Sequence, residues 1–478
     1  MSESLKQKTL KGTKWSAVEK LSVQVFQFLV MLVMARLLTP DDYGTVGLVA
    51  IFTAIAQSLV ESGFSQALVR KQDRTDVDCN TVFYFNLVVS LALYGLCFII
   101  APFVAEFYEI PVLCPLMRVI CLVFVVNGLA VVQRAIFTAV VDFRSQAIAN
   151  LAAGLVSGVL GIGSAYLGYG VWALVIQQLS NALVLTVVLW MLSTWRPKLQ
   201  YSRASFHELF GFGSKFMISG IINTVYNNIS GMIIGKIYTP ATLGYYSRAQ
   251  HFSTVPSSTL SGIVSSVTYP VLCTIQDQNE KLQDVYRRLI KMSAYIVFPL
   301  MILMSAVAEP MVIILVGEKW RFSGELLTII GFSMMWYPIH LLNLNLLAVK
   351  GRSDLFLRLE IIKKLIGLIV ICVSIPFGIV VFAYCGILSS IISLVINTYY
   401  TGKLINVGFF TQMKDIFNTF IMSMTMFVLI RLTYLLIDNI YIQFVGGGIF
   451  GIIYILAYSK IFKFRELEEV VDIIKKKK

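Results

Sequence analysis

The stretch "ARLLTPDDYG" at residues 35–44 returns two hundred positions later as "GKIYTPATLG" at residues 235–244. In each copy a basic residue, Arg36 or Lys236, precedes a Thr-Pro pair, and a glycine follows the proline. Proline ends a helix, a basic side chain complements the negative end of the helix dipole, and glycine frees the backbone where the next helix starts. We interpret the repeat as a structural hairpin shared by two duplicated halves.

The composition is that of a membrane protein. Of the 478 residues, 57% are hydrophobic and 14% are charged, whereas a soluble domain carries about a quarter charged residues. Apolar runs of about 20 residues, enough to cross a hydrocarbon core about 30 Å thick, recur from end to end. The chain is therefore predicted to be an all-α polytopic membrane protein.

These runs predict fourteen transmembrane helices. The turn in "SIPFGIVVFAYCG" at residues 374–386 separates the eleventh span from the twelfth, and one broken helix there would reduce the number to thirteen. The predicted spans are 15–37, 44–68, 81–105, 112–137, 145–167, 170–193, 209–235, 243–270, 290–316, 324–349, 358–380, 381–402, 414–436 and 440–462.

Basic residues gather in alternate loops. With a cytoplasmic N-terminus, most of the 39 Lys and Arg residues fall in cytoplasmic segments, and few fall in outer loops. This positive-inside pattern predicts that both termini are cytoplasmic, which requires an even number of spans. It also accounts for the net charge of +13 without nucleic-acid binding, because the basic residues are dispersed and no basic, aromatic groove is indicated.

The repeat also predicts how the spans are grouped. Its offset equals six spans with their loops, and "KGTKW" at 11–15 resembles "FGSKF" at 212–216. Because six is even, both halves enter the membrane in the same sense, as in parallel repeats related by an axis along the membrane normal. We expect two six-helix lobes, residues 1–200 and 201–405, followed by two peripheral helices and a basic cytoplasmic tail in residues 406–478.

Several stretches resemble one known family. They are "MARLLTPDDYG" at 34–44, "ESGFSQALVRKQD" at 61–73, "TVFYFNLVVSLALYG" at 81–95 and "LGYYSRAQ" at 243–250. On these residues the chain resembles the Wzx-type polysaccharide and O-antigen flippases, which are lipopolysaccharide biosynthesis proteins of the multidrug/oligosaccharidyl-lipid/polysaccharide exporter superfamily. The resemblance covers nearly the whole chain and is specific for the family but weak for the substrate.

The resemblance implies a flippase of the bacterial plasma (inner) membrane. Such a protein moves undecaprenyl-pyrophosphate-linked oligosaccharide units to the outer leaflet by alternating access, for assembly of O-antigen, capsule or exopolysaccharide. It implies no cofactor, coupling to a proton, a sodium ion or the membrane potential, and a polysaccharide polymerase as partner. The basic end of the chain, Lys475 to Lys478, is expected to contact anionic membrane lipids. A cation-coupled multidrug antiporter of the same superfamily is the main alternative, although spans 13 and 14 and the excess of cationic residues favour an anionic lipid substrate.

Catalytic motifs are absent from the sequence. It contains no P-loop, no G-x-S-x-G and no H-E-x-x-H, and its seven cysteines and three histidines are dispersed without metal-site spacing. A membrane polysaccharide polymerase or glycosyltransferase is the least favoured alternative, since it is expected to present a large outer loop with clustered charges. We expect a secondary-type transporter without a metal site.

Ionisable residues inside the predicted spans are the candidates for binding, because a charge at the bilayer centre costs about 2.5–3.5 kcal/mol. The cationic candidates, expected to bind pyrophosphate in a cavity, are Lys20, Lys215, Arg248, Lys363 and Lys364. The acidic candidates, expected to couple an ion, are Glu61, Glu19 and Glu360. Snorkelling lysines, an interfacial arginine and fixed ion pairs are the structural alternatives, and Arg118 and Arg431 are interpreted as structural.

Neutral amides are also frequent in the spans. They would bond sugar hydroxyls along a hydrated cavity, or bond one another between helices. These amides are Gln24, Gln27, Gln57, Asn127, Asn150, Gln177, Gln178, Asn181, Asn223, Asn227, Asn228, Asn343 and Asn345.

One segment outside the spans is amphipathic. In "TIQDQNEKLQDVYRRLIKM", residues 274–292, Leu282, Val285, Tyr286 and Leu289 share one helical face. This pattern predicts a helix lying on the cytoplasmic membrane surface.

Overall fold

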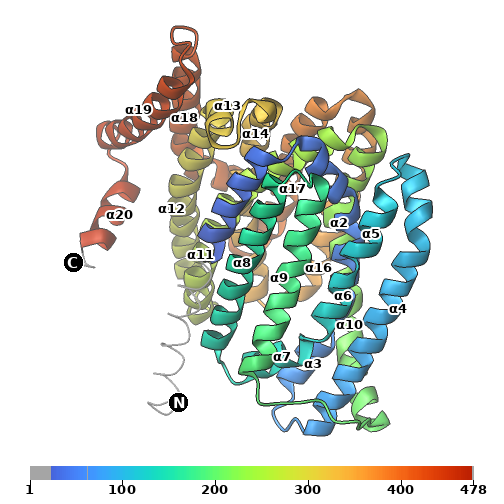
Figure 1. The fold of residues 1–478 in the computed structure, drawn as a ribbon. Coiled ribbons are helices and arrows are strands. Elements are labelled where there is room, and N and C mark those ends of the chain that lie inside the picture. Colours follow the sequence, from blue (N-terminus) through green and yellow to red (C-terminus); the bar gives the residue numbers. More distant parts are fainter. Residues whose placement is uncertain (1–22, 62, 476–478) are drawn as a thin grey trace. The chain divides into compact units, whose positions relative to one another are not determined.

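The computed structural model describes residues 23–61 and 63–475, and all regular secondary structure within these residues is helical (Figure 1). This confirms the all-α prediction. The helices in chain order are Val23–Leu37, α2 (Pro40–Glu61), α3 (Phe64–Arg70), α4 (Asp76–Tyr108), α5 (Leu113–Ile120), α6 (Leu122–Gly128), α7 (Val131–Ala139), α8 (Phe143–Tyr166), α9 (Val171–Leu192), α10 (Arg203–Ile237), α11 (Pro240–Thr274), α12 (Asn279–Ala306), α13 (Ala308–Val316), η1 (Glu318–Trp320), α14 (Arg321–Met334), α15 (Tyr337–Val349), α16 (Ser353–Ser374), η2 (Ile375–Phe377), α17 (Ile379–Ile405), α18 (Phe409–Thr433), α19 (Ile440–Ile461) and α20 (Arg465–Lys475).

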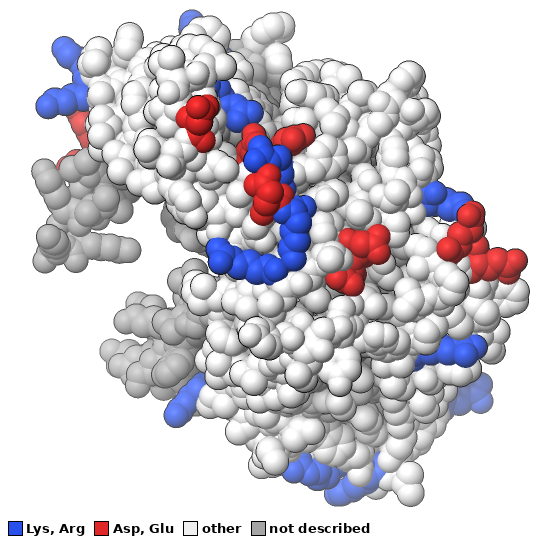
Figure 2. Space-filling model, turned by 45° about the horizontal axis from the view of Figure 1, so that its top comes forward, with Lys and Arg blue, Asp and Glu red and all other residues white. Residues whose placement is uncertain are grey.

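Many of these helices are long and apolar enough to cross a membrane. Nine helical stretches meet that condition within the described residues, counting Pro40–Arg70 (α2 and α3) and Glu318–Val349 (η1, α14 and α15) as one each. A tenth span is obtained if the bent pair Leu113–Gly128 and Val131–Ala139 is one span. Large apolar side chains such as Tyr166 and Leu436 are more than 80% exposed on the protein surface. On the face shown in Figure 2, the Lys, Arg, Asp and Glu side chains gather in a few groups and leave wide areas between them without charge. A surface of this kind is suited to lipid.

The chain separates into two compact units. Unit 1 ends at Gly244 and unit 2 begins at Tyr245, within α11. Unit 1 therefore holds both copies of the repeated turn, since the second copy ends at Gly244. The two lobes and the two peripheral helices expected from the repeat, with boundaries near residues 200 and 405, remain a prediction.

Each repeated turn is built on a threonine cap. Thr39 Oγ1 accepts a hydrogen bond of 3.2 Å from the Asp42 backbone N–H, and Thr239 Oγ1 accepts one of the same length from that of Thr242. The preceding helix ends at Leu37, just before the Thr-Pro pair, as predicted, and Pro40 is the first residue of the following helix, α2, so Gly44 lies inside α2 and not where it starts. Proline is favoured there since its fixed φ suits a helix and the first N–H has no partner within the helix.

The eleventh and twelfth predicted spans are separate helices. The turn between α16 and α17 contains η2 and Gly378, whose φ of +103° is a conformation that glycine adopts without strain. The two helices pack against each other. The single broken helix considered as an alternative is therefore excluded.

The predicted surface helix is not present as such. Its residues belong to α12, one continuous helix from Asn279 to Ala306. Leu282 and Tyr286 have no exposed surface and pack in the hydrophobic core of unit 2. Asp415 of α18 is only 3% exposed and accepts two hydrogen bonds of 2.7 Å from Arg287. The apolar face is therefore covered by protein, which explains why amphipathicity alone misassigned this segment.

Candidate functional site

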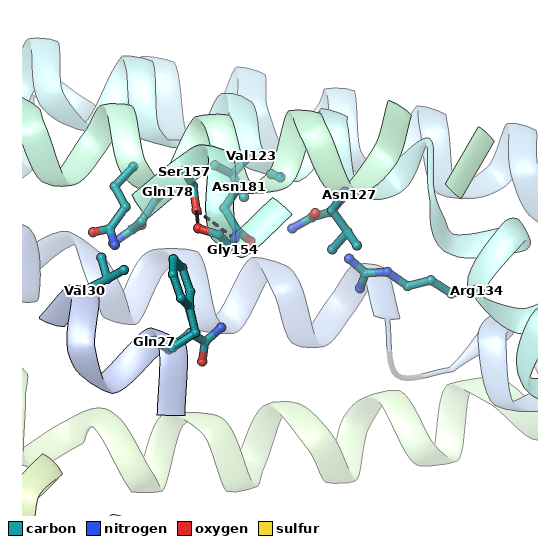
Figure 3. A pocket seen from close by; sticks show the side chains of 13 residues that line it. Gln27, Val30, Val123, Asn127, Arg134, Gly154, Ser157, Gln178 and Asn181 are labelled. Atoms are coloured by element: carbon teal, nitrogen blue, oxygen red, sulfur yellow. Dashed lines mark hydrogen bonds between the residues drawn. The ribbon is translucent and has the colours of Figure 1, made fainter. Parts of the chain in front are cut away.

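A polar cavity of about 410 Å³ lies within unit 1. Its walls come from Val23–Leu37, α6, α7, α8 and α9, and Figure 3 shows the side chains of these elements converging on it. The described lining residues are Phe26, Gln27, Val30, Val123, Asn127, Arg134, Gly154, Ser157, Gln177, Gln178, Asn181, Ala182 and Leu185.

Amide groups dominate the polar part of the wall. Asn181 donates a hydrogen bond of 3.1 Å to Ser157 Oγ, and Asn127 donates one of 3.0 Å to the Gln57 side-chain oxygen outside the lining set. Gln27 and Gln178 are exposed, and neither side chain has a hydrogen bond within the described part of the chain. An amide both donates and accepts, so this wall can bind hydroxyl groups in either sense.

Arg134 is the one charged side chain among the described lining residues. The chain bends by 41° between α6 and α7, and Arg134 lies one turn into α7. Figure 3 shows its guanidinium extending towards the interior of the pocket, beside Asn127. Guanidinium recognises phosphate and carboxylate groups through paired hydrogen bonds. The cavity therefore combines one anion-binding group with a wall suited to hydroxyl groups.

Sequence reasoning identified the amides of this cavity but missed Arg134. The thirteen amides named from the sequence include Gln27, Asn127, Gln177, Gln178 and Asn181, all of which line it. Arg134 lies near the end of the predicted span 112–137 and was counted only among the cytoplasmic basic residues that indicate topology. Its position within the apolar run "VVQRAIFTA" was the signal that it belongs to a membrane helix.

Other amides serve the structure. Asn343 and Gln412 are fully buried in unit 2 and exchange two hydrogen bonds of 3.0 Å. Asn345 donates to Ser265 Oγ at 2.6 Å. These pairs join helices, which is the second role expected for amides inside a membrane protein.

For the four candidates in the first half of the chain, the structure describes no side chain to place relative to the cavity. Glu19 and Lys20 lie outside the described residues. The backbones of Glu61 and Lys215 lie in α2 and α10, but their side chains are outside the described part of the structure. Their proposed roles remain predictions.

The remaining candidates belong to unit 2 and are not part of the lining of the unit 1 cavity. Arg248 is partly buried in α11. Glu360 and Lys363 form an ion pair within α16, as their spacing predicted, and Lys364 is partly buried on the same helix. Whether any of them binds substrate or an ion remains a prediction.

The two repeated turns pack against each other within unit 1. A Cβ at Gly44 would overlap the carbonyl oxygen of Pro240, and a Cβ at Gly244 would overlap that of Pro40. A second close backbone contact joins Gly63 to Gly213 of α10, since a Cβ at Gly63 would lie 2.6 Å from the Gly213 carbonyl oxygen. Helices from the two halves of the repeat therefore meet at two places where only glycine fits.

A cluster of ion pairs is centred on Lys71, which follows Gly63 closely in the sequence. Lys71 Nζ lies 2.9 Å from Glu208 of α10 and 3.1 Å from Asp78 of α4. The hydrogen bond with Glu208 is the main cause that raises the pKa of Lys71, and Asp78 acts in the same direction. Lys71 thus remains charged and links three segments, the α3–α4 loop, α4 and α10.

Comparison with known proteins places these features in context. The family model described as "Polysaccharide biosynthesis protein" matches residues 33–325. A Klebsiella pneumoniae protein named "Uncharacterized membrane protein in cps region" is 24% identical over 477 residues, which are 96% of this chain and 97% of that protein. The Escherichia coli (strain K12) "Lipopolysaccharide biosynthesis protein WzxC" is 25% identical over 366 residues, which are 75% of this chain and 74% of that protein.

A solved structure establishes the fold. The structure described as "Lipid II flippase MurJ, inward closed conformation" is similar to this chain with a TM-score of 0.78 and 14% sequence identity. The similarity covers 95% of this chain and 99% of that one. The arrangement of helices is therefore that of a known membrane transporter.

Proposed function

The chain belongs to the polysaccharide biosynthesis protein family, and from that premise we propose that it is a flippase for undecaprenyl-pyrophosphate-linked oligosaccharide. It acts in the bacterial plasma membrane and supplies units for cell-surface polysaccharide. The unit 1 cavity is the observation that carries this proposal, because its amides suit sugar hydroxyls and Arg134 suits a phosphate group.

The proposed topology has fourteen spans and two cytoplasmic termini. Ten spans correspond to the apolar helices already described, when the bent pair is counted as one. The other four are the first predicted span, α10, α11 and α16, which carry the cationic candidates from Lys20 to Lys364. Helices that line a hydrated cavity tolerate such charges, which supports their assignment as spans despite lower hydropathy. Six spans then form each lobe, and spans 13 and 14 are peripheral.

The proposed mechanism is alternating access by a secondary-type transporter. The reciprocal Gly–Pro contact lies on the predicted outer side, and the Lys71 cluster lies on the predicted cytoplasmic side. Opening one of these contacts at a time would expose the cavity to one side of the membrane. Lys20 and Lys215 would assist Arg134 in binding pyrophosphate on the cytoplasmic side, with Arg248, Lys363 and Lys364 contacting substrate later in the cycle.

The proposed energy source is an ion gradient or the membrane potential. Glu19, Glu61 and Glu360 are the candidates for coupling a proton or a sodium ion. A polysaccharide polymerase is the proposed recipient of the flipped unit, and anionic lipids are the proposed contacts of the basic tail.

The proposal is tested by reconstituting the protein in sealed vesicles with a fluorescent undecaprenyl-pyrophosphate oligosaccharide. Movement between leaflets is followed as protection from a glycan-cleaving enzyme added outside. Arg134→Gln should slow movement at least about tenfold, since a hydrogen bond to a charged group contributes about 1.5–3 kcal/mol. Arg144→Gln, on the exposed start of the neighbouring α8, is the matched control and should leave the rate unchanged.

Two results would reject the proposal. One is the absence of movement under every imposed ion gradient, together with gradient-driven transport of a small cationic drug, which would identify an antiporter. The other is an unchanged rate in Arg134→Gln, which would remove the unit 1 cavity from the substrate path.

A further inference from the structure

A second cavity, of about 430 Å³, lies in unit 2 where α13, α14, α18 and α19 meet. It is separate in the chain from the unit 1 cavity, and the proposed transport mechanism assigns it no role. The described lining residues are Glu309, Pro310, Ile313, Arg321, Arg431, Tyr434, Leu435, Asp438, Ile440 and Gln443. Its volume is in the range of pockets that bind small molecules.

The cavity contains two arginines in different environments. Arg321 forms ion pairs of 2.6 Å with both Glu309 and Glu318. Its charge is therefore neutralised by neighbouring carboxylates, and Arg321 is part of the wall.

Arg431 has aromatic neighbours in place of carboxylates. Its guanidinium carbon lies 6.0 Å from the centre of the Phe427 ring and 5.7 Å from that of Tyr434. Within residues 23–61 and 63–475, no carboxylate forms an ion pair with it. Aromatic rings orient a guanidinium while leaving its N–H groups available, so Arg431 presents donors to an anion in the cavity.

Asp438 supplies an opposite charge to the same cavity. It lies in the turn between α18 and α19, its side chain is exposed, and it has no ion-pair partner within the described part of the chain. Among the charged residues described in the lining, the two without an ion pair are thus a cation, Arg431, and an anion, Asp438. This combination suits a ligand that carries both a negative and a positive group.

The margin of the cavity is apolar. Leu435 and Leu436 are 79% and 87% exposed, and they follow α18, one of the helices long and apolar enough to cross a membrane. Ile440 of α19, also such a helix, lines the cavity. The charged groups therefore lie at the ends of spans, where lipid headgroups are found, with apolar side chains beside them for acyl chains.

We propose that this cavity binds a phospholipid whose headgroup joins a phosphate to a primary amine. Arg431 binds the phosphate oxygens, Asp438 accepts hydrogen bonds from the ammonium group, and the acyl chains lie along Leu435 and Leu436. The site holds the α18–α19 hairpin to the surrounding bilayer and is independent of the transported substrate.

Native mass spectrometry of the purified, full-length protein in detergent tests this site. Phosphatidylethanolamine, phosphatidylcholine and phosphatidylglycerol are titrated separately at matched acyl composition. Phosphatidylethanolamine should bind most tightly, since phosphatidylcholine cannot donate hydrogen bonds to Asp438 and phosphatidylglycerol has no cation. Arg431→Gln should weaken phosphatidylethanolamine binding at least about tenfold, in line with the loss of a hydrogen bond to a charged group.

Two further variants separate local from general effects. Asp438→Asn should lower phosphatidylethanolamine affinity to that of phosphatidylcholine, and this exposed position is compatible with normal folding. Arg118→Gln is the matched control, because Arg118 also lies over an aromatic ring, Phe98, at 4.2 Å, but in unit 1. It should bind all three lipids as the wild-type protein does.

Three results would overturn the proposal. The first is equal affinity of the wild-type protein for the three lipids. The second is phosphatidylethanolamine affinity within about twofold of wild type in a folded Arg431→Gln variant, a change too small for a lost charged hydrogen bond. The third is equally effective competition by soluble glycerophosphoethanolamine, which would assign the cavity to a water-soluble zwitterion.

Discussion

Gly44 packs against the carbonyl oxygen of Pro240 so closely that no side chain fits at position 44. Gly244 stands in the same relation to Pro40. The sequence repeat is therefore also a spatial contact, in which each copy of the turn supplies both a glycine and a proline. This contact explains why the chain contains the same short stretch twice.

Gly44→Ala should disrupt this contact. The added methyl group must displace backbone atoms, and overpacking of this kind costs about 1–3 kcal/mol. We expect a lower unfolding temperature in detergent and slower substrate movement in vesicles. Gly95→Ala is the matched control, since a Cβ at this helical glycine of α4 meets nothing within 4 Å. Equal unfolding temperatures for the two variants would show that the contact with Pro240 does not exclude a side chain at position 44.

Gln178→Ala should distinguish glycan binding from lipid binding. Gln178 is exposed in the unit 1 cavity, so the substitution removes an amide without removing a structural bond. The expected result is about two- to tenfold weaker binding of the oligosaccharide-bearing substrate, the effect of one neutral hydrogen bond. Binding of undecaprenyl pyrophosphate without sugars should be unchanged. Gln146→Ala serves as control, because Gln146 of α8 is partly exposed, lies outside the cavity lining and, within the described residues, donates only to Thr138. Equal loss for both ligands would contradict a glycan-specific role.

Lys71→Gln should destabilise the protein more than Glu208→Gln. Asp78 is 1% exposed and loses its cation in the first variant, at a cost of about 1–3 kcal/mol. Glu208 is 61% exposed, and an exposed ion pair contributes about 1 kcal/mol or less. Thermal unfolding of both variants in one detergent checks the order, and the reverse order would show that Asp78 is satisfied without Lys71.

The same cluster predicts a pH dependence. Because folding raises the pKa of Lys71 above its ordinary value of 10.5, the stabilisation is complete below that value. It should be lost as the pH rises through the higher pKa of the folded protein. The difference in unfolding temperature between wild type and Lys71→Gln should accordingly be constant from pH 7 to 9, and a difference that fell within this range would assign the effect to another group.

Gln412→Leu alone should lower the stability of the protein more than Gln412→Leu combined with Asn343→Leu. Alone it removes both 3.0 Å hydrogen bonds between the two buried amides, so that Asn343 keeps only its bonds with the Ile339 carbonyl and the Thr401 hydroxyl, at a cost of about 1–3 kcal/mol. Replacing both residues by leucine also removes the incompletely bonded Asn343 amide and should recover part of the lost stability. Thermal unfolding of the single and double variants tests this. Additive losses would show that the two amides are satisfied independently of each other.

Sequence periodicity and composition predicted the helical fold because most of the predicted spans are long and apolar. The cavity was harder to predict. Its amides could be named one by one, but α8 and α9 had to be placed side by side before Asn181 and Ser157 could be seen to bond. Arg134 was missed because it lies near the cytoplasmic end of the predicted span 112–137, where a basic side chain is expected to reach the headgroups.

Amphipathicity was ambiguous for a related reason. Leu282 and Tyr286 form an apolar stripe that suits either a membrane surface or a protein core. Asp415 of α18, more than a hundred residues away in the sequence, decides that the stripe faces protein. Its carboxylate binds Arg287, which lies on the same helix as Leu282 and Tyr286. Local pattern cannot supply such a distant partner.

The reciprocal packing of the two turns has the form of an isologous interface, in which the same surface patch occurs on both sides of a two-fold axis. Such an interface is usual between the identical subunits of a homodimer. Here it lies within a single polypeptide. In an ancestral dimer of half-length chains, one substitution would have altered both sides of the contact at once, whereas gene fusion allows each side to change separately. The two copies do differ around the shared proline and glycine, with Asp41-Asp42-Tyr43 in one and Ala241-Thr242-Leu243 in the other, as that freedom would allow.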